Sequence, residues 1–295
     1  MTKTKKVESR THLKKRKKFG NEKNLKMKNL KLIMVFAISL FANNLFAQGA
    51  YVNINAGYGL SMGSQNLDDF YNYTSGSNSS TSERVNVSLG KGLNVGGAFG
   101  YMFNKNIGAE LGISYLLGGK SNATDEYTGR KIDYTLSAKM LRINPSLVIA
   151  SGLDGINPYA KFGLVIGSGS IMYEYNDNYD GNIEIMKTKL NGGLAFGLNA
   201  GVGALFNLND KMTFFGEINM VNMSYAPTKG EVTEATYNGA DELPDMTTSE
   251  KETEFVDSYT SSWSNPPADS QPSKELKQKL PFGSFGINFG LRISL

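Results

Sequence analysis

The sequence contains no cysteine and only one histidine, His12, among its 295 residues. Disulfide bonds are therefore excluded, as are zinc sites built from Cys and His ligands. Nucleophilic sites of the Ser-His-Asp or Cys-His kind cannot form from the residues that follow His12. Neither a Walker motif nor a dinucleotide-binding glycine motif occurs. We therefore expect a non-enzymatic protein without cofactor or metal.

The sequence also lacks a convincing transmembrane helix. Its apolar run "LIMVFAISLFANNLFA" (32–47) is short and is followed at once by Gln and Gly. Thirteen Lys and Arg lie within residues 1–31, and the small residue Ala47 ends the run. This order predicts a secretory signal peptide over residues 1–47, cleaved after Ala47. Translation from Met27 would give a signal of ordinary length, and a long basic region is the alternative.

The chain after the signal peptide has little positive charge. Residues 1–47 hold thirteen of the 31 Lys and Arg but only two of the 27 Asp and Glu. Residues 48–295 therefore carry 18 basic against 25 acidic residues, a net charge of −7. Nucleic acid is accordingly not an expected partner, because binding to it depends on clustered positive charge.

Period-two alternation is what the sequence has in abundance, together with 33 glycines. In the last eleven residues, large apolar side chains alternate with small or polar ones, which is typical of a strand with two unlike faces. The apolar positions there are Phe285, Ile287, Phe289, Leu291, Ile293 and Leu295. The pattern recurs to give eight segments: 51–60, 93–103, 107–117, 141–149, 160–167, 194–206, 212–220 and 285–295.

The connections between these segments alternate in length. Three are short and rich in Asn, Asp and Gly, which predicts turns: 104–106, 151–158 and 207–211. Four are long and polar: 61–88, 118–133, 168–190 and 226–280. This rhythm predicts an all-β fold, an eight-stranded antiparallel up-and-down transmembrane barrel with four long outer loops and three short periplasmic turns. A soluble lipocalin-like binding barrel is the alternative, since alternation does not say which face is inside.

Three stretches resemble the small eight-stranded outer-membrane β-barrel family of the OmpA/OmpX type: 157–167, 214–220 and 285–295. The resemblance extends over the barrel domain, residues 48–295. It implies the outer membrane of a Gram-negative cell, and membrane lipid and the outer-membrane assembly machinery as partners. The six apolar residues of the last strand should then face lipid, and this strand should pair with segment 51–60. The family favours a terminal aromatic residue, where this sequence has Leu295.

Charged residues on the opposite, inward face are the candidate functional residues. Ionisable groups inside membrane proteins are costly, so they mark either ion-paired networks or solute pathways. Their first interpretation is a structural network that closes the lumen, with Arg292 pairing with Glu110 or Glu217. The second is a narrow path for ions or small solutes. The candidate residues are Glu110, Arg142, Lys161, Glu217 and Arg292.

The long connections are the other candidate region. Residues 176–187 match part of a calcium-binding loop, but Lys187 stands where a bidentate Glu is needed, so we expect a polar turn. The longest connection, 226–280, is polar and acidic, and its composition is typical of a disordered segment. Two roles remain open for the protein: a structural and surface-interaction role through acidic outer loops, with a surface ligand bound by 226–280, or a small passive pore.

Overall fold

The computed structural model describes residues 49–62, 70–260 and 268–295. The predicted signal peptide and Trp263 lie outside these residues. The described residues form one compact unit from Gly49 to Leu295. They contain no helix that is long and apolar enough to cross a membrane.

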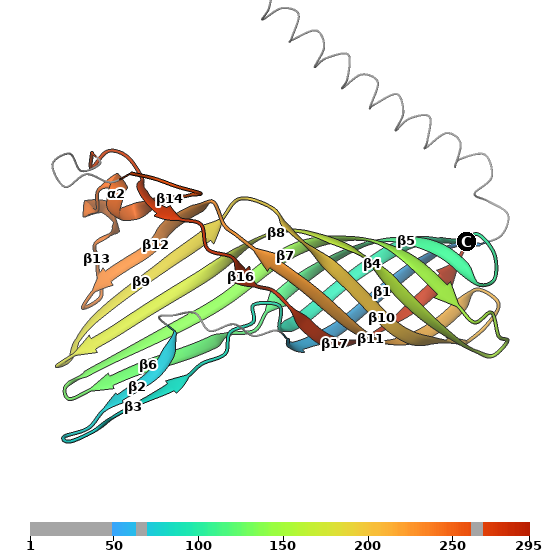
Figure 1. Ribbon diagram of the computed structural model, residues 1–295, viewed down its shortest axis with the longest axis horizontal. Coiled ribbons are helices and arrows are strands. Elements are labelled where there is room, and N and C mark those ends of the chain that lie inside the picture. Colours follow the sequence, from blue (N-terminus) through green and yellow to red (C-terminus); the bar gives the residue numbers. More distant parts are fainter. Residues whose placement is uncertain (1–48, 63–69, 261–267) are drawn as a thin grey trace, which may run out of the picture. The chain divides into compact units, whose positions relative to one another are not determined.

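The described residues are almost entirely β-structure, in a single sheet of seventeen strands (Figure 1). The expected count of eight strands is therefore not confirmed. Nine strands are long or central: β1 Ala50–Ser61, β4 Gly92–Met102, β5 Ile107–Gly118, β7 Arg130–Ala150, β8 Ile156–Tyr179, β9 Asn182–Asn191, β10 Ala195–Asn207, β11 Met212–Tyr225 and β17 Ser284–Ser294. The others are β2 Tyr71–Ser75, β3 Ser80–Arg84, β6 Ser121–Tyr127, β12 Lys229–Tyr237, β13 Ala240–Asp241, β14 Glu252–Val256, β15 Ser273–Leu276 and β16 Leu280–Pro281.

The antiparallel pairings close a ring. They run from β1 to β4, β5, β7, β8, β10, β11 and β17, and β17 pairs with β1. Val52 lies opposite Ile293 and Leu60 opposite Phe285, so the expected pairing of the last strand with the first is confirmed. Each segment with period-two alternation matches one strand of this ring, with at most one terminal residue outside it. Closure leaves the ring without an unpaired edge, as backbone in hydrocarbon requires.

The two ends of the ring differ. At one end, called the inner end because the sequence predicts periplasmic turns there, short turns connect the strands, and Asn104 and Asn209 each accept hydrogen bonds from two backbone N–H groups that follow them. At the outer end, β7 and β8 continue beyond the ring as a hairpin, and β9 pairs with both β8 and β12. The connections 118–133 and 168–190 are therefore largely β-structure rather than irregular loops.

The segment 226–280 is β-structure only in part. It contains four complete short strands, β12 to β15, with the 3-10 helix η1 Leu243–Asp245 and the helix α2 Thr248–Lys251. β12 pairs with β9 along most of its length. Its polar composition did not indicate these strands, because a hairpin with both faces in water needs few apolar residues.

The outward face of the ring is apolar. Phe289 is 55% exposed and Leu295 is 70% exposed, and the large apolar residues on the outward face of the neighbouring strands are also exposed. Phe289 stacks on Phe214, with ring centroids 6.2 Å apart. A soluble lipocalin-like barrel requires the reverse arrangement, with polar residues outside, so the surface favours lipid as its surroundings.

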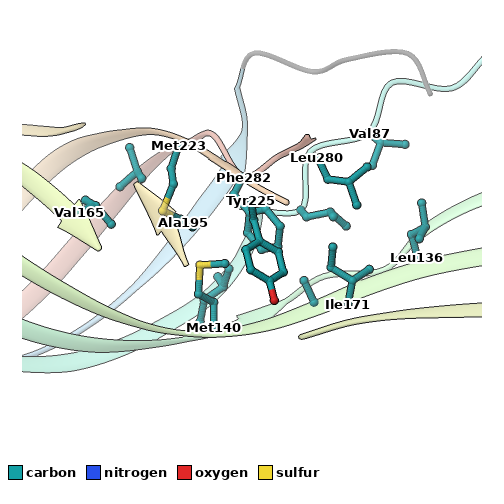
Figure 2. Packing of buried hydrophobic residues seen from close by; sticks show 14 of the residues in the cluster. Val87, Leu136, Met140, Val165, Ile171, Ala195, Met223, Tyr225, Leu280 and Phe282 are labelled. Atoms are coloured by element: carbon teal, nitrogen blue, oxygen red, sulfur yellow. The ribbon is translucent and has the colours of Figure 1, made fainter. Parts of the chain in front are cut away.

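Two apolar clusters lie inside the ring, one at each end. The outer cluster includes Val87, Leu89 and Phe282, all 0% exposed, which come from the connections rather than from the ring strands. Figure 2 shows Tyr225 and Phe282 at its centre; their rings meet edge to face, with centroids 5.7 Å apart. The inner cluster consists of Val148, Ala150, Tyr159, Leu205 and Phe215. A polar layer lies on the inward faces of the strands between these clusters.

Candidate functional site

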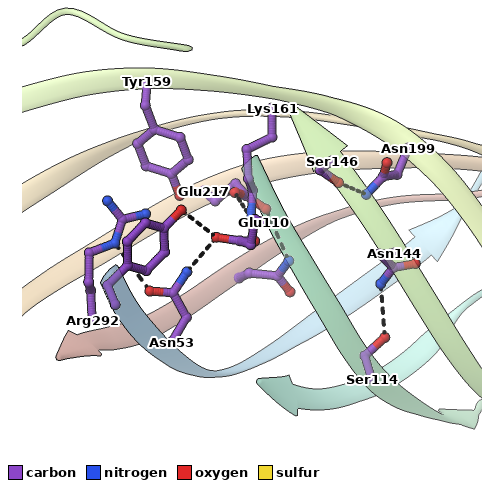
Figure 3. A network of polar contacts seen from close by, with 12 residues as sticks. Asn53, Glu110, Ser114, Asn144, Ser146, Tyr159, Lys161, Asn199, Glu217 and Arg292 are labelled. Carbon is purple, nitrogen blue, oxygen red and sulfur yellow. Dashed lines mark hydrogen bonds and ion pairs between the residues drawn. The ribbon is translucent and has the colours of Figure 1, made fainter. Parts of the chain in front are cut away.

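Lys161 is at the centre of the polar layer (Figure 3). Its Nζ lies 3.1 Å from Oε1 of Glu110 and 2.8 Å from Oε2 of Glu217. The three residues come from β8, β5 and β11, which are not neighbours in the ring, so their side chains meet across the lumen. The lysine side chain is 16% exposed, and the glutamates are 6% and 5% exposed. One buried cation thus bridges two buried carboxylates.

Neutral side chains also donate hydrogen bonds to both glutamates. Tyr51 and Asn53 donate hydrogen bonds of 3.1 and 2.7 Å to Oε2 of Glu110. Tyr159 donates one of 2.9 Å to Oε2 of Glu217, and Asn288 makes a longer contact of 3.5 Å with Oε1. Hydrogen bonds of this kind are what stabilises buried carboxylates, since burial without them is costly.

Arg292 joins this layer through a different contact from the expected one. Its Nε donates a 3.2 Å hydrogen bond to Oδ1 of Asn53. Its guanidinium lies over the Tyr51 ring, 3.8 Å from the centroid, in cation–π geometry. Within the described part of the chain, no ion pair connects Arg292 with Glu110 or Glu217. Asn53 and Tyr51 therefore lie between Arg292 and Glu110 and contact both of them.

Arg142 is the candidate residue that does not join the Lys161 network. It lies on β7 and is 3% exposed, but its Nε and Nη2 have no hydrogen-bond partner. Its neighbours are polar and uncharged. Asn144 makes a 3.5 Å contact with Ser114, and Asn199 a 3.4 Å contact with Ser146.

Alternation places Asn53 and Asn288 on the inward face, but it predicts neither their contacts with the glutamates nor the part that Tyr51 and Tyr159 take in the network. The period-two alternation does indicate that both tyrosines point inward. Tyr51 is two residues before inward Asn53, and Tyr159 is two residues before inward Lys161. The glycines carried a second signal. A Cβ on Gly100 would overlap the Tyr51 ring, so a glycine opposite a large inward residue makes room for it.

A second polar group lies on the hairpin that β7 and β8 form beyond the ring. Asp177 on β8 is buried, accepts hydrogen bonds from the Arg130 guanidinium and forms an ion pair with it; Tyr175 also donates to this carboxylate. The Arg130 hydrogen bonds hold the pKa of Asp177 below its usual range. Asp125 on β6 differs, because burial raises its pKa and its Oδ1 has no partner. An open hollow of about 320 Å³ adjoins Arg130, Asp177 and Tyr237.

The partial calcium-loop match falls on a two-residue hairpin turn. Tyr179 pairs with Asn182 across it, and Asp180 and Gly181 have φ values of 47° and 86°. This is the polar turn that the sequence predicted. The described residues contain no group of three or more His, Cys, Asp or Glu side chains placed to hold a metal ion.

A closed, apolar-coated ring of antiparallel strands around a polar lumen defines an outer-membrane β-barrel. Residues 30–243 match the model of the family described as outer membrane protein beta-barrel domain, and the chain belongs to that family. This match confirms the resemblance seen in the sequence, and with it the location in the Gram-negative outer membrane. No curated protein matches the sequence.

Solved outer-membrane proteins are similar to the chain at low sequence identity. Acinetobacter baumannii CarO is 12% identical, and the match covers 85% of this chain and 99% of that one, with a TM-score of 0.30. CarO2 of the same species is 13% identical, with 84% and 99% covered and a TM-score of 0.31. Ail, the attachment invasion locus protein of Yersinia pestis, is 12% identical, with 84% and 100% covered and a TM-score of 0.27. Such low scores carry no information on function.

Proposed function

We propose that this protein is a non-enzymatic outer-membrane barrel with a closed lumen, whose role is carried by the ordered hairpins outside the membrane. Its membrane wall is the ring of eight strands from β1 to β17. The length of β8 is the observation that carries the proposal. A tilted strand crosses the membrane in about 9–11 residues, whereas β8 has 24 residues. About a dozen residues, roughly 40 Å of strand, are then left for the outside.

The charge of the outer structure indicates the chemistry of a surface partner. Segment 226–280 has 11 Asp and Glu against 5 Lys. Glu231 on β12 lies directly opposite Glu252 on β14, whereas Glu254 lies opposite Lys229. The side chains of the three glutamates are exposed. Like charges directly opposite each other cost stability, which a basic partner would relieve. The proposed ligand is therefore a basic protein or peptide surface.

A cationic peptide such as nona-arginine tests this proposal on the purified barrel in neutral detergent. The variant E231Q/E252Q removes the two opposed outer charges, and D154N/D210N removes two charges from the inner turns as a matched control. We expect the first variant to bind the peptide at least tenfold more weakly and the control to bind like the wild type. Equal affinity of all three proteins would contradict the proposed surface. Heat-modifiable gel mobility checks that each variant is folded.

A small passive pore remains the second candidate function, supported by the polar lining of the lumen. The filled interior favours the closed barrel, because Lys161 bridges both carboxylates and the two apolar clusters lie on either side of this layer. Conductance across a planar bilayer separates the two. If the barrel is closed, the current across the bilayer should show no conductance steps in about 1 M salt, where charges are strongly screened. Stable steps whose size follows the salt concentration would establish the pore.

The same contacts support the absence of catalysis. Glu110 and Glu217 are the carboxylates available for acid–base work in the lumen. Both are occupied by Lys161 and by tyrosine or asparagine donors. The same proposal includes the signal peptide over residues 1–47 and delivery by the outer-membrane assembly machinery. A barrel of the outer membrane must first leave the cytoplasm.

A further inference from the structure

The lumen contains a buried cation that nothing described in the structure neutralises. Arg142 is 3% exposed, and its Nε and Nη2 lack hydrogen-bond partners. Lys161 and Arg292, the other lumen cations, each have a partner. Buried guanidinium groups are otherwise found paired, because removing the charge from water costs several kcal/mol.

A cavity of about 70 Å³ adjoins Arg142. Around the arginine it is lined by small polar side chains, Ser114, Asn144, Ser146 and Asn199, which Figure 3 shows to one side of the Lys161 network. The Nδ2 groups of Asn144 and Asn199 point to the hydroxyls of Ser114 and Ser146, whereas Oδ1 of both asparagines has no partner. The side chains near Arg142 are therefore neutral, and the two serine hydroxyls are donors that can turn toward a ligand.

The opposite end of the cavity is bounded by Lys161, Glu110 and Glu217. The two carboxylates there are already held by the lysine and by tyrosine and asparagine donors. Between the two apolar clusters, the inward charges are two carboxylates against Arg142, Lys161 and Arg292. The lumen is thus left with one uncompensated positive charge, and Arg142 is the residue that carries it.

We propose that the cavity is a binding site for one small inorganic anion of the halide class, held by the Arg142 guanidinium and the neighbouring serine hydroxyls. The anion supplies the charge that the lumen lacks. Its size is limited by the cavity: one water needs about 10–15 Å³ by the same measure, so there is room for an anion with a few waters. A sugar or a nucleotide does not fit. The site is independent of any ligand bound by the outer hairpins.

Bromide tests the site, because it replaces chloride and is located by its anomalous scattering. Crystals of the full barrel grown in sodium bromide should show one anomalous peak within hydrogen-bonding distance of the Arg142 guanidinium. The unfolding midpoint should also be higher in chloride or bromide than in gluconate at equal ionic strength, since a ligand bound only by the folded state stabilises it. Gluconate is too large for the cavity.

Two variants separate the site from a general salt effect. In R142M the anomalous peak and the halide dependence should both disappear. In K139M both should remain, because Lys139 is an exposed cation on the same strand. If R142M does not fold, the two wild-type measurements still decide. Water alone beside Arg142 in the bromide crystals, together with equal midpoints in halide and gluconate, would overturn the proposal.

Discussion

Replacing Lys161 by methionine is expected to destabilise the barrel by about 3–5 kcal/mol, the usual cost of removing one partner from a buried ion pair. The lysine lies 3.1 and 2.8 Å from the two carboxylate oxygens that it bridges. Each pair at about 3 Å is worth roughly 5–6 kcal/mol of gross attraction at an effective dielectric constant of about 20. Desolvation of all three groups offsets most of this attraction in the intact network. The K161M variant loses the attraction but leaves both carboxylates buried.

Removing all three charges together should be far less harmful. In the triple variant E110Q/K161M/E217Q, the glutamine oxygens can still accept from Tyr51, Asn53 and Tyr159. None of these three positions then carries an unpaired charge, so the triple variant should be clearly more stable than K161M, although Arg142 and Arg292 no longer have a carboxylate in the lumen. Lys211 in a short inner turn is exposed, and K211M is the matched control, with an expected change within about 0.5 kcal/mol.

Urea unfolding of the barrel in lipid vesicles, followed by far-ultraviolet circular dichroism, measures these differences. A loss below about 1 kcal/mol in K161M would mean that water screens the charges far more than their burial indicates. A triple variant as unstable as K161M would refute the argument in another way. It would show that the lysine acts through packing of its methylenes rather than through its charge.

The other predictions concern the outer hairpins, the lumen and the lipid face. D177N should lower the hydrogen-exchange protection of the β7–β8 hairpin at pH 7, because the ionised form of Asp177 is stabilised by Arg130; this advantage is present above about pH 4 and disappears as the pH falls through the lowered pKa. D125N should have the opposite effect and raise protection at pH 7, since the pKa of Asp125 is raised by burial, and the gain should shrink as the pH falls through that raised pKa. In G100V the new side chain would overlap Tyr51, so we expect a loss of about 1–3 kcal/mol in urea unfolding; an unchanged midpoint would contradict the close packing. F289R places a charge midway along β17 on the lipid face, with an expected cost of about 2–4 kcal/mol in the same assay, whereas a soluble barrel would tolerate it.

The sequence determined the faces of the ring strands. Period-two alternation fixes which residues point in and which point out, because successive side chains of a strand lie on opposite sides. Alternation therefore predicts Phe289 and Leu291 outward and Arg292 inward, and in the structure the first two are exposed and Arg292 is buried. The short turns were also readable, since the asparagines there bond to the backbone that follows them.

The length of the outer strands was not readable in the same way. Segments such as 168–190 and 226–280 are polar on both faces, and their strands rely on pairing with neighbours rather than on an apolar face. β9 and β12 pair with each other across a separation of about forty residues, which local patterns do not report. The outer apolar cluster was missed for the same reason: Val87 and Phe282 are isolated apolar residues in polar surroundings and meet only after the ring closes.

The partners of the lumen charges were decided by tertiary structure alone. Alternation places Glu110, Lys161, Glu217, Arg142 and Arg292 inside, but it says nothing of their height along the barrel. That height depends on the stagger between strands, which is a property of the closed ring rather than of any single strand. The stagger brings Lys161 between the two glutamates and sets Arg292 on Tyr51. It leaves Arg142 among serines and asparagines, beside the cavity that we propose an anion fills.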